Sequence, residues 1–323
     1  MRVGFDARGR QDTRGIGRYV RSLLDALRAT AGHGDEVVEI RRPRRVDVHH
    51  SPWIDGALLH PPCPMVVTLH DLVPLKRRGE YLRTGLRFRL RYRAVQRATR
   101  VIVPTHAVAR DADELLGLGP DRVDVVAVAP ATTFRRASPE RVGEMRRRYE
   151  LPEDYLLWVG GLEHPDPRKR VADLARTPHR LPLVLVGRPG RWAQELQGVH
   201  LTGHVPDEDL AAIYTGAHAL VFPSDDEGFG LPPVEALACG TPVVASDVPA
   251  VREVLDGRAT LVDPADVAAL LAAAERAERP APEPPRWTWH DAARATWRVY
   301  EEVSASSARS TSARDPHRPR DHG

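Results

Sequence analysis

Two carboxylates eight residues apart, Glu227 and Glu235, are the leading candidates for chemistry in this chain. The apolar run 219–222 precedes them and indicates a buried parallel strand, because it has no polar alternation. An acidic, glycine-rich turn follows, and Pro232 or Pro233 suits the first turn of a helix, where a missing N–H costs nothing. Such a strand–turn–helix unit directs free backbone N–H groups at an anion, and a carboxylate can accept two hydrogen bonds from sugar or ribose hydroxyls. The stretch therefore predicts a site for an anion beside sugar hydroxyls.

A second candidate group is a basic pair that follows a glycine strand end. The strand expected over 155–159 leads to Gly160 and then to Arg168 and Lys169, at the start of a predicted helix. A cation at a helix N-terminus is otherwise unfavourable, so either side chain is a candidate to neutralise a diphosphate. The alternative is an ordinary solvated basic run.

A glycine turn and a strand-end histidine are the candidates in the first half of the chain. Gly15 and Gly17 open a predicted helix, and glycines permit close backbone approach to a phosphate, although such a pair often makes only a turn. His70 follows the apolar strand 65–69, at the end where open α/β sheets place ligand groups. It could bond a sugar hydroxyl or carry a proton, or it could form a capping pair with Asp71 that only shapes the loop.

The segment from Glu227 to Ser246 resembles the E-x7-E signature of the retaining glycosyltransferases of family 4, which have the GT-B fold. The resemblance covers the chain from Met1 to about Val303 and is nearest to bacterial mannosyltransferase-like members. It implies transfer of a hexose, with mannose named first, from a nucleoside diphosphate sugar to a hydroxyl acceptor, with retention of configuration. It also implies that the reaction needs no metal or other cofactor.

The same resemblance implies roles for individual residues. Glu227 would hold the sugar hydroxyls, His70 would bind the sugar near the reacting carbon, and Lys169 would stabilise the leaving diphosphate. The implied donor-binding residues are Gly15, Gly17, Arg168, Lys169, Val205, Phe229, Gly230, Leu231 and Glu235. Gly161 stands where many members have arginine and the loop after it is longer, so Arg168 stays an alternative to Lys169 for the phosphate contact.

The order of elements predicts an α/β fold of the GT-B type, with two Rossmann-like domains whose parallel sheets face each other across a cleft. We expect an acceptor domain at 1–150 and a nucleotide-sugar donor domain at 151–286. A final helix at 287–303 is expected to pack back on the first domain. The Ser-, Arg- and Pro-rich residues 304–323 are expected to be disordered.

Charge is distributed unevenly along the 323 residues. Residues 1–150 hold 29 Lys and Arg against 18 Asp and Glu, whereas residues 151–323 hold 18 against 26. Residues 76–100 hold ten basic side chains and one acid, with apolar residues at four-residue intervals. This pattern predicts an amphipathic helix whose arginines either contact an anionic membrane or are solvated.

Composition also bounds location and partners. No apolar run approaches the ~18 residues of a membrane span. Cys63 and Cys239 lack metal-ligand spacing, which favours two reduced thiols. We expect a cytoplasmic protein without a nucleic-acid partner, for which the basic segment opens the option of peripheral attachment to the inner face of the membrane. The acceptor could then be lipid-linked.

Two other functions remain open at this point. One is a sugar-nucleotide epimerase or phosphorylase on the same architecture, which the intact pair of Glu227 and Glu235 disfavours. The other is a catalytically silent or partner-dependent GT-B binding subunit, which turnover by the purified chain would exclude. The sequence names neither the sugar and base of the donor nor the acceptor.

Overall fold

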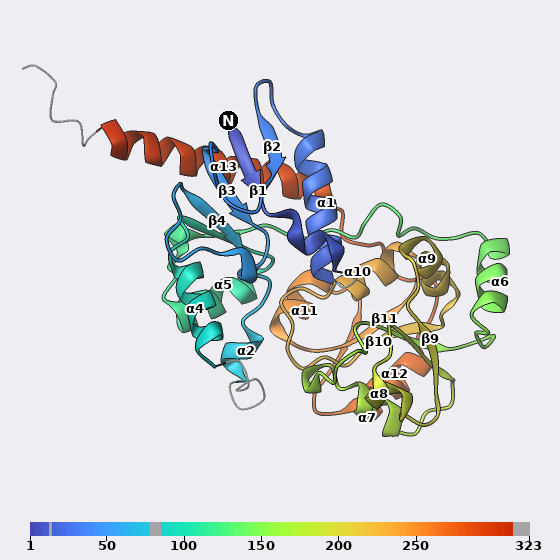
Figure 1. Ribbon diagram of the computed structural model, residues 1–323. Helices are drawn as coiled ribbons and strands as arrows, with labels where there is room; N and C mark the ends of the chain where they lie inside the picture. Colours follow the sequence, from blue (N-terminus) through green and yellow to red (C-terminus); the bar gives the residue numbers. More distant parts are fainter. Residues whose placement is uncertain (13–14, 78–84, 313–323) are drawn as a thin grey trace, which may run out of the picture. The chain divides into compact units, whose positions relative to one another are not determined.

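The computed structural model describes residues 1–12, 15–77 and 85–312, and the chain divides into two compact units (Figure 1). The first unit comprises 1–104, 109–127 and the C-terminal part from residue 289. The second unit comprises 105–108 and 128–288. Each contains one sheet of six strands, all paired in parallel and flanked by helices, which confirms the predicted α/β class with two parallel sheets.

The first unit is built on a sheet in which β3 and β4 are central. In sheet order its strands are β2 (Glu36–Glu39), β1 (Arg2–Phe5), β3 (Val48–Ser51), β4 (Met65–Thr68), β5 (Arg100–Val103) and β6 (Val123–Val125). Its helices are η1 (Ala7–Gln11), α1 (Gly15–Ala29), η2 (Ile54–Gly56), α2 (Val73–Lys76), α4 (Gly85–Gln96), most of α5 (His106–Leu116), η4 (Pro120–Arg122) and α13 (Trp289–Ser312).

The second unit repeats this plan. In sheet order its strands are β12 (Thr260–Val262), β11 (Val243–Ser246), β10 (Ala219–Phe222), β7 (Leu156–Val159), β8 (Leu183–Val186) and β9 (Val199–Gly203). Its helices are α6 (Pro139–Arg148), η5 (Pro167–Lys169), α7 (Val171–Arg176), α8 (Arg191–Gln194), α9 (Asp207–Gly216), α10 (Leu231–Ala238), α11 (Pro249–Leu255) and α12 (Val267–Glu275).

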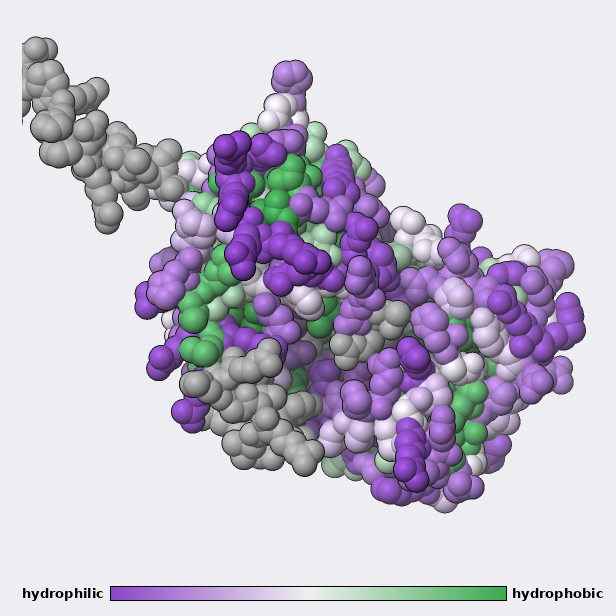
Figure 2. All heavy atoms as spheres, viewed as in Figure 1, coloured by the Kyte–Doolittle hydropathy of each residue, from purple (hydrophilic) through white to green (hydrophobic). Residues whose placement is uncertain are grey.

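The central strands lack polar alternation because helices cover both of their faces. Every residue of β4, β8, β10 and β11 is buried. In the second unit, Leu156, Val221 and Val244 of neighbouring strands join one apolar cluster with Leu270 of α12. Hydrophilic side chains cover most of the face shown in Figure 2, as expected when the apolar residues are used inside the two units.

The units and the C-terminal helix differ in extent from the sequence-based expectation. The chain passes between units after residue 127, rather than at 150, so α6 belongs to the second unit, where it packs on α9. Helix α13 groups with the first unit and continues to Ser312, so residues 304–312 are helical and not disordered. No glycine or proline interrupts that stretch, and the helix therefore propagates through it. The remaining tail lies outside the described residues.

A chain of buried hydrogen bonds fastens α13 to the first sheet. The Tyr300 hydroxyl lies 2.6 Å from His50 Nδ1, and His50 Nε2 lies 2.9 Å from Thr68 Oγ1, which is 3.1 Å from the Tyr19 hydroxyl. All four side chains are at most 5% exposed. Burial lowers the pKa of His50 to about 3, and the neighbouring His49 and His70 act in the same direction. His50 is therefore neutral in the folded protein and joins α13 to β3 and β4 without a buried charge.

This burial makes the stability of the protein depend on pH through His50. The unfolded imidazole takes up a proton near pH 6.5, whereas the folded one does so only near pH 3, so stability present above pH 6.5 is lost as the pH falls. We expect the wild type to lose about 2 kcal/mol more than His50→Gln between pH 7.5 and 5.0. Urea unfolding at both pH values measures this difference. Equal losses in the two proteins would contradict a neutral, buried His50.

Candidate functional site

The predicted acidic and basic side chains of the second unit meet at one sheet edge. Strands β7 and β10 pair in parallel, so their carboxyl ends lie side by side. Glu227 follows β10, and Arg168 lies in η5 after β7. The Arg168 Nη1 atom is 3.5 Å from Glu227 Oε2, while its Nε donates to Asp166 Oδ2 at 2.9 Å. Both side chains of the Arg168–Glu227 pair keep partial exposure, 16% and 13%.

Lys169 lies beside this pair, at the end of β7. Its ammonium nitrogen is 5.8 Å from the centroid of the Trp158 ring, within cation–π range. A Cβ atom on Gly160 would stand 2.6 Å from the Trp158 ring and 3.3 Å from Lys169 Nζ, so the position requires glycine. The glycine at this strand end therefore leaves room for the Lys169 ammonium group.

The turn between Glu227 and α10 has a fixed shape. Gly230 adopts φ of 90°, in the left-handed region that favours glycine, and it caps α10. Phe229 is 8% exposed and its ring meets the Trp287 ring edge to face at 6.4 Å. Leu231 is the first residue of α10. The three predicted donor-binding residues thus lie in the connection between the end of β10 and the helix that carries Glu235.

Glu235 is fully buried behind this turn. Its exposed fraction is 0%, and its Oε2 accepts a hydrogen bond of 3.0 Å from the hydroxyl of Tyr214, on α9. Burial together with the Glu235 carboxylate raises the pKa of Cys239 to about 12, so this thiol is not reactive. A ribose can reach the Glu235 carboxylate only when the groups that cover it move.

Val205 follows β9 and immediately precedes the N-terminal cap of α9. Its side chain is 4% exposed, while His204 and Pro206 beside it are exposed. A ligand at this turn would therefore contact backbone groups of Val205 and not its isopropyl group.

In the first unit, His70 follows β4 and has a defined tautomer. Its Nε2 lies 2.9 Å from the carbonyl oxygen of Pro52, and a carbonyl only accepts, so Nε2 carries the proton and Nδ1 is an acceptor. Burial lowers the pKa of His70, which keeps the ring neutral. The structure supports only one half of the predicted capping pair. Asp71 Oδ1 accepts from the backbone N–H of Val73, and that hydrogen bond does not involve His70.

The glycines of the first unit lie at the start of α1. Gly15 is its first residue. A Cβ atom at Gly17 would stand 1.7 Å from the carbonyl oxygen of Asp12, so glycine alone allows the chain to turn back so closely before the helix. The sequence-based role of this turn in phosphate binding stays a prediction.

Asp6 and Tyr214 were not assigned roles by the sequence analysis. Asp6 directly follows β1, is 0% exposed, and accepts from Arg8 Nε at 2.9 Å and Arg8 Nη2 at 2.6 Å. Burial opposes its ionisation, but the Arg8 hydrogen bonds outweigh burial and lower its pKa. A carboxylate directly after a buried strand was a usable signal for Asp6. Tyr214 gave no such signal, because its partner Glu235 is 21 positions away.

Two kinds of feature are absent from the described part of the chain. Residues 1–12, 15–77 and 85–312 contain no group of three or more His, Cys, Asp or Glu side chains that could hold a metal ion. Across the same ranges, no helix has the length and apolar character needed to cross a membrane.

Comparison with known proteins identifies the family. The model described as "Glycosyltransferase Family 4" matches residues 35–127, and the model described as "Glycosyl transferases group 1" matches residues 153–278. A D-inositol 3-phosphate glycosyltransferase of Frankia alni is 33% identical over 287 residues, which cover 76% of this chain and 68% of that protein. The chain belongs to the family 4 glycosyltransferases.

Mannosyltransferases are among the relatives of this glycosyltransferase. The O-antigen chain mannosyltransferase B of Escherichia coli is 34% identical over 172 residues, which cover 47% of this chain and 44% of that protein. The serotype-specific mannosyltransferase WbdA of Escherichia coli is 29% identical over 242 residues, covering 67% and 29%. The chain therefore spans less than half the length of either mannosyltransferase.

Solved structures show the same fold. HepE of Anabaena, in complex with UDP and glucose, matches with a TM-score of 0.66 at 17% identity, over 97% of this chain and 100% of that one. Sucrose-phosphate synthase of Thermosynechococcus elongatus matches with a TM-score of 0.68 at 18% identity, over 97% and 98%. These likenesses confirm the GT-B fold of the glycosyltransferase.

The hydrogen bond between Tyr214 and Glu235 generates a stability prediction. Tyr214→Phe removes one donor from a fully buried carboxylate, and we expect the free energy of unfolding to fall by about 1–3 kcal/mol. Tyr149→Phe is the matched control, because Tyr149 donates at 2.8 Å to Asp209, which keeps Arg141 and Arg148 as partners. Urea unfolding should show a loss below about 1 kcal/mol for the control. Similar losses in both variants would show that the Tyr214–Glu235 hydrogen bond contributes no more to the free energy of unfolding than the control bond does.

Proposed function

We propose that this glycosyltransferase transfers a hexose, with mannose as the first candidate, from a nucleoside diphosphate sugar to a hydroxyl acceptor and retains the anomeric configuration. The observation that carries the proposal is the grouping of Glu227, Arg168 and Lys169 at the adjoining ends of β7 and β10. The mannosyltransferases among its relatives support the choice of sugar, and HepE in complex with UDP and glucose supports a nucleotide donor. The acceptor is expected to be a glycan, glycolipid or other glycoconjugate precursor.

Charge stabilisation at the leaving group is the main task that these residues can perform. As the bond between the sugar C1 and the phosphate oxygen breaks, negative charge grows on the diphosphate, and Lys169 would stabilise it. Arg168 is held between Asp166 and Glu227, so it would serve chiefly to orient Glu227 and add positive charge nearby. Glu227 would accept hydrogen bonds from sugar hydroxyls. We propose that no resident metal is needed, since these cations supply the compensating charge.

The acceptor side of the reaction follows by analogy with the family. The acceptor hydroxyl oxygen would bond to C1 on the face from which the diphosphate leaves, and its proton would pass to the leaving phosphate oxygen. His70 has a neutral ring whose Nδ1 is an acceptor, which suits a hydrogen bond from a sugar hydroxyl better than transfer of a full proton. Glu235 would reach the ribose after the groups over it have moved.

Calorimetric titration with GDP, UDP and dTDP, without added metal, tests this function. We expect one nucleotide to bind, and we expect Lys169→Ala to weaken its affinity at least tenfold, about 1.4 kcal/mol. Lys76→Ala is the control, because Lys76 pairs with Asp111 in the first unit. Glu227→Ala should abolish transfer of the sugar yet keep the nucleotide affinity within about threefold, since Glu227 contacts the sugar and not the diphosphate.

The outcomes separate the competing functions. Failure of all three nucleotides to bind would overturn the proposed donor class and favour a silent or partner-dependent subunit. Binding without turnover for any acceptor tried would also favour that subunit. Unchanged turnover in Glu227→Ala would overturn the assignment of the site, whichever nucleotide binds.

We also propose that α4 contacts an anionic membrane surface. Arg89, Arg93 and Arg97 are exposed at four-residue intervals, and Leu90 beside them is 36% exposed. The buried face of this segment consists instead of Tyr92, Ala94, Val95 and Ala98. Leu90 is one of the apolar residues that recur at four-residue intervals in the sequence, but it lies with the exposed arginines and not on the buried face. Positions 78–84, which include Arg83, lie outside the described residues, as does the side chain of Arg87.

Vesicle sedimentation tests this membrane contact. Each surface arginine contributes about 1 kcal/mol of attraction to an anionic bilayer, so Arg89→Gln with Arg93→Gln should weaken binding by about tenfold or more. Arg147→Gln with Arg191→Gln removes the same charge from exposed positions in the second unit and is the control. Binding to phosphatidylserine-containing vesicles that is equal in both double variants would refute the proposal.

A further inference from the structure

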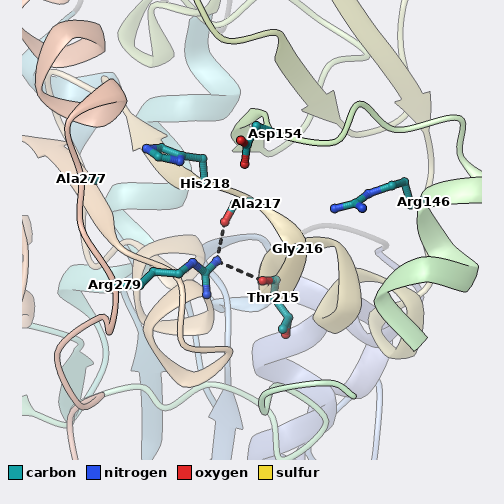
Figure 3. Close-up of a pocket in the computed structure, with 8 residues that line it drawn as sticks. All are labelled: Arg146, Asp154, Thr215, Gly216, Ala217, His218, Ala277 and Arg279. Carbon is teal, nitrogen blue, oxygen red and sulfur yellow. Dashed lines mark hydrogen bonds between the residues drawn. The ribbon is translucent and has the colours of Figure 1, made fainter. Parts of the chain in front are cut away.

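A polar cavity lies at the amino ends of the strands of the second sheet, whereas Glu227 and Lys169 follow the carboxyl ends. It has a volume of about 470 Å³ and is drawn in Figure 3. His218 directly precedes β10, and Asp154 lies two residues before β7, so the cavity is at the amino ends of these strands. Its lining residues are Arg146, Asp154, Thr215, Gly216, Ala217, His218, Ala277 and Arg279.

Positive charge dominates the cavity. Arg146 comes from α6 and Arg279 from the segment after α12, and they reach the space from different sides (Figure 3). Asp154 is the single carboxylate among the lining residues. Burial, and then the nearby Arg136, lower the pKa of Arg279, while Tyr155 and Asp154 act in the opposite direction. An anion in the cavity would relieve this excess of positive charge.

Arg279 is held in place before any ligand arrives. Its Nη1 donates to the carbonyl oxygen of Gly240 at 2.9 Å, and its Nη2 donates to the carbonyl oxygens of Thr215 at 3.0 Å and Ala217 at 2.5 Å. These carbonyls lie at the C-terminal ends of α9 and α10, whose negative dipole ends the guanidinium offsets. A fixed cation loses little side-chain freedom when an anion binds beside it.

Two buried nitrogen atoms at the cavity have unused hydrogen-bonding capacity. Arg146 Nη2 donates to the carbonyl oxygen of Glu153 at 2.9 Å, but within the described ranges Arg146 Nε has no partner. His218 Nε2 likewise has no hydrogen-bond partner among the described residues. Buried polar atoms are normally satisfied, so either nitrogen would gain a hydrogen bond if its side chain turned toward an acceptor in the cavity.

We propose that this cavity binds a phosphate group, carried either by free inorganic phosphate or by a phosphomonoester such as a hexose phosphate. A tetrahedral phosphate presents acceptor oxygens in several directions, so it can be approached by the side chains of Arg146, His218 and Arg279, which come from three different segments. The volume falls within the ~300–1,000 Å³ of small-molecule sites, which leaves space for a sugar beside the phosphate. The site is distinct from the donor residues and does not depend on the proposed donor.

Thermal unfolding of the full chain in phosphate tests this site. The Lys169→Ala background removes the phosphate contact proposed at the donor site. In that background, phosphate at ten times its Kd should raise Tm by about 3 °C, at ionic strength held constant with chloride. Arg146→Gln, added to Lys169→Ala, should weaken phosphate binding at least tenfold, and His218→Gln should do the same. Arg147→Gln, exposed on the same helix and not lining the cavity, is the matched control and should keep the shift.

The outcomes decide both the site and the source of the phosphate. If Arg146→Gln and His218→Gln bind phosphate within twofold of their parent, the proposal is overturned. It is overturned as well if neither 20 mM phosphate nor 10 mM glucose 6-phosphate shifts the Tm of the parent. A glucose 6-phosphate affinity at least tenfold above that of phosphate, and sensitive to Arg146→Gln, supports a phosphomonoester. Equal affinities with the same sensitivity support free phosphate.

Discussion

The parallel pairing of β7 with β10 is the constraint on which the second unit depends. Parallel strands all end at the same edge of their sheet, so residues that follow different strands become neighbours. Glu227 and Arg168 are 59 positions apart in the chain and yet form an ion pair at this edge. Without that strand pairing, the acidic turn and the basic 3-10 helix would be unrelated loops.

The first unit also anchors a distant helix, α13, by buried polar groups rather than by packing alone. In the first unit, Tyr300 of α13 bonds to His50 of β3, and Trp297 donates to the carbonyl oxygen of Leu27 at 3.2 Å. In the second unit, Arg279 joins the C-terminal ends of α9 and α10. Buried hydrogen bonds are costly when left unmade, so those of Tyr300 and Trp297 specify one register for α13.

The carboxyl ends and the amino ends of the strands in the second sheet carry different arrangements of charge. At the carboxyl edge, Arg168 is matched by Asp166 and Glu227. At the amino ends of the strands, Asp154 is the one carboxylate that lines the cavity with Arg146 and Arg279. The Arg279 guanidinium donates its hydrogen bonds to backbone carbonyls. An acidic composition over the second half of the chain therefore coexists with a cavity lined by two arginines and one carboxylate, which no count of charges along the sequence could reveal.

The sequence by itself determined the α/β class, the parallel strands and the acidic turn, because apolar runs without alternation and glycines in fixed context have few structural solutions. It also indicated Glu227, Arg168 and Lys169, which the fold then brought together. It did not determine that Glu235 is buried on Tyr214 or that α6 belongs to the second unit. These features arise from contacts between residues far apart in the chain, and only the tertiary structure decides such contacts.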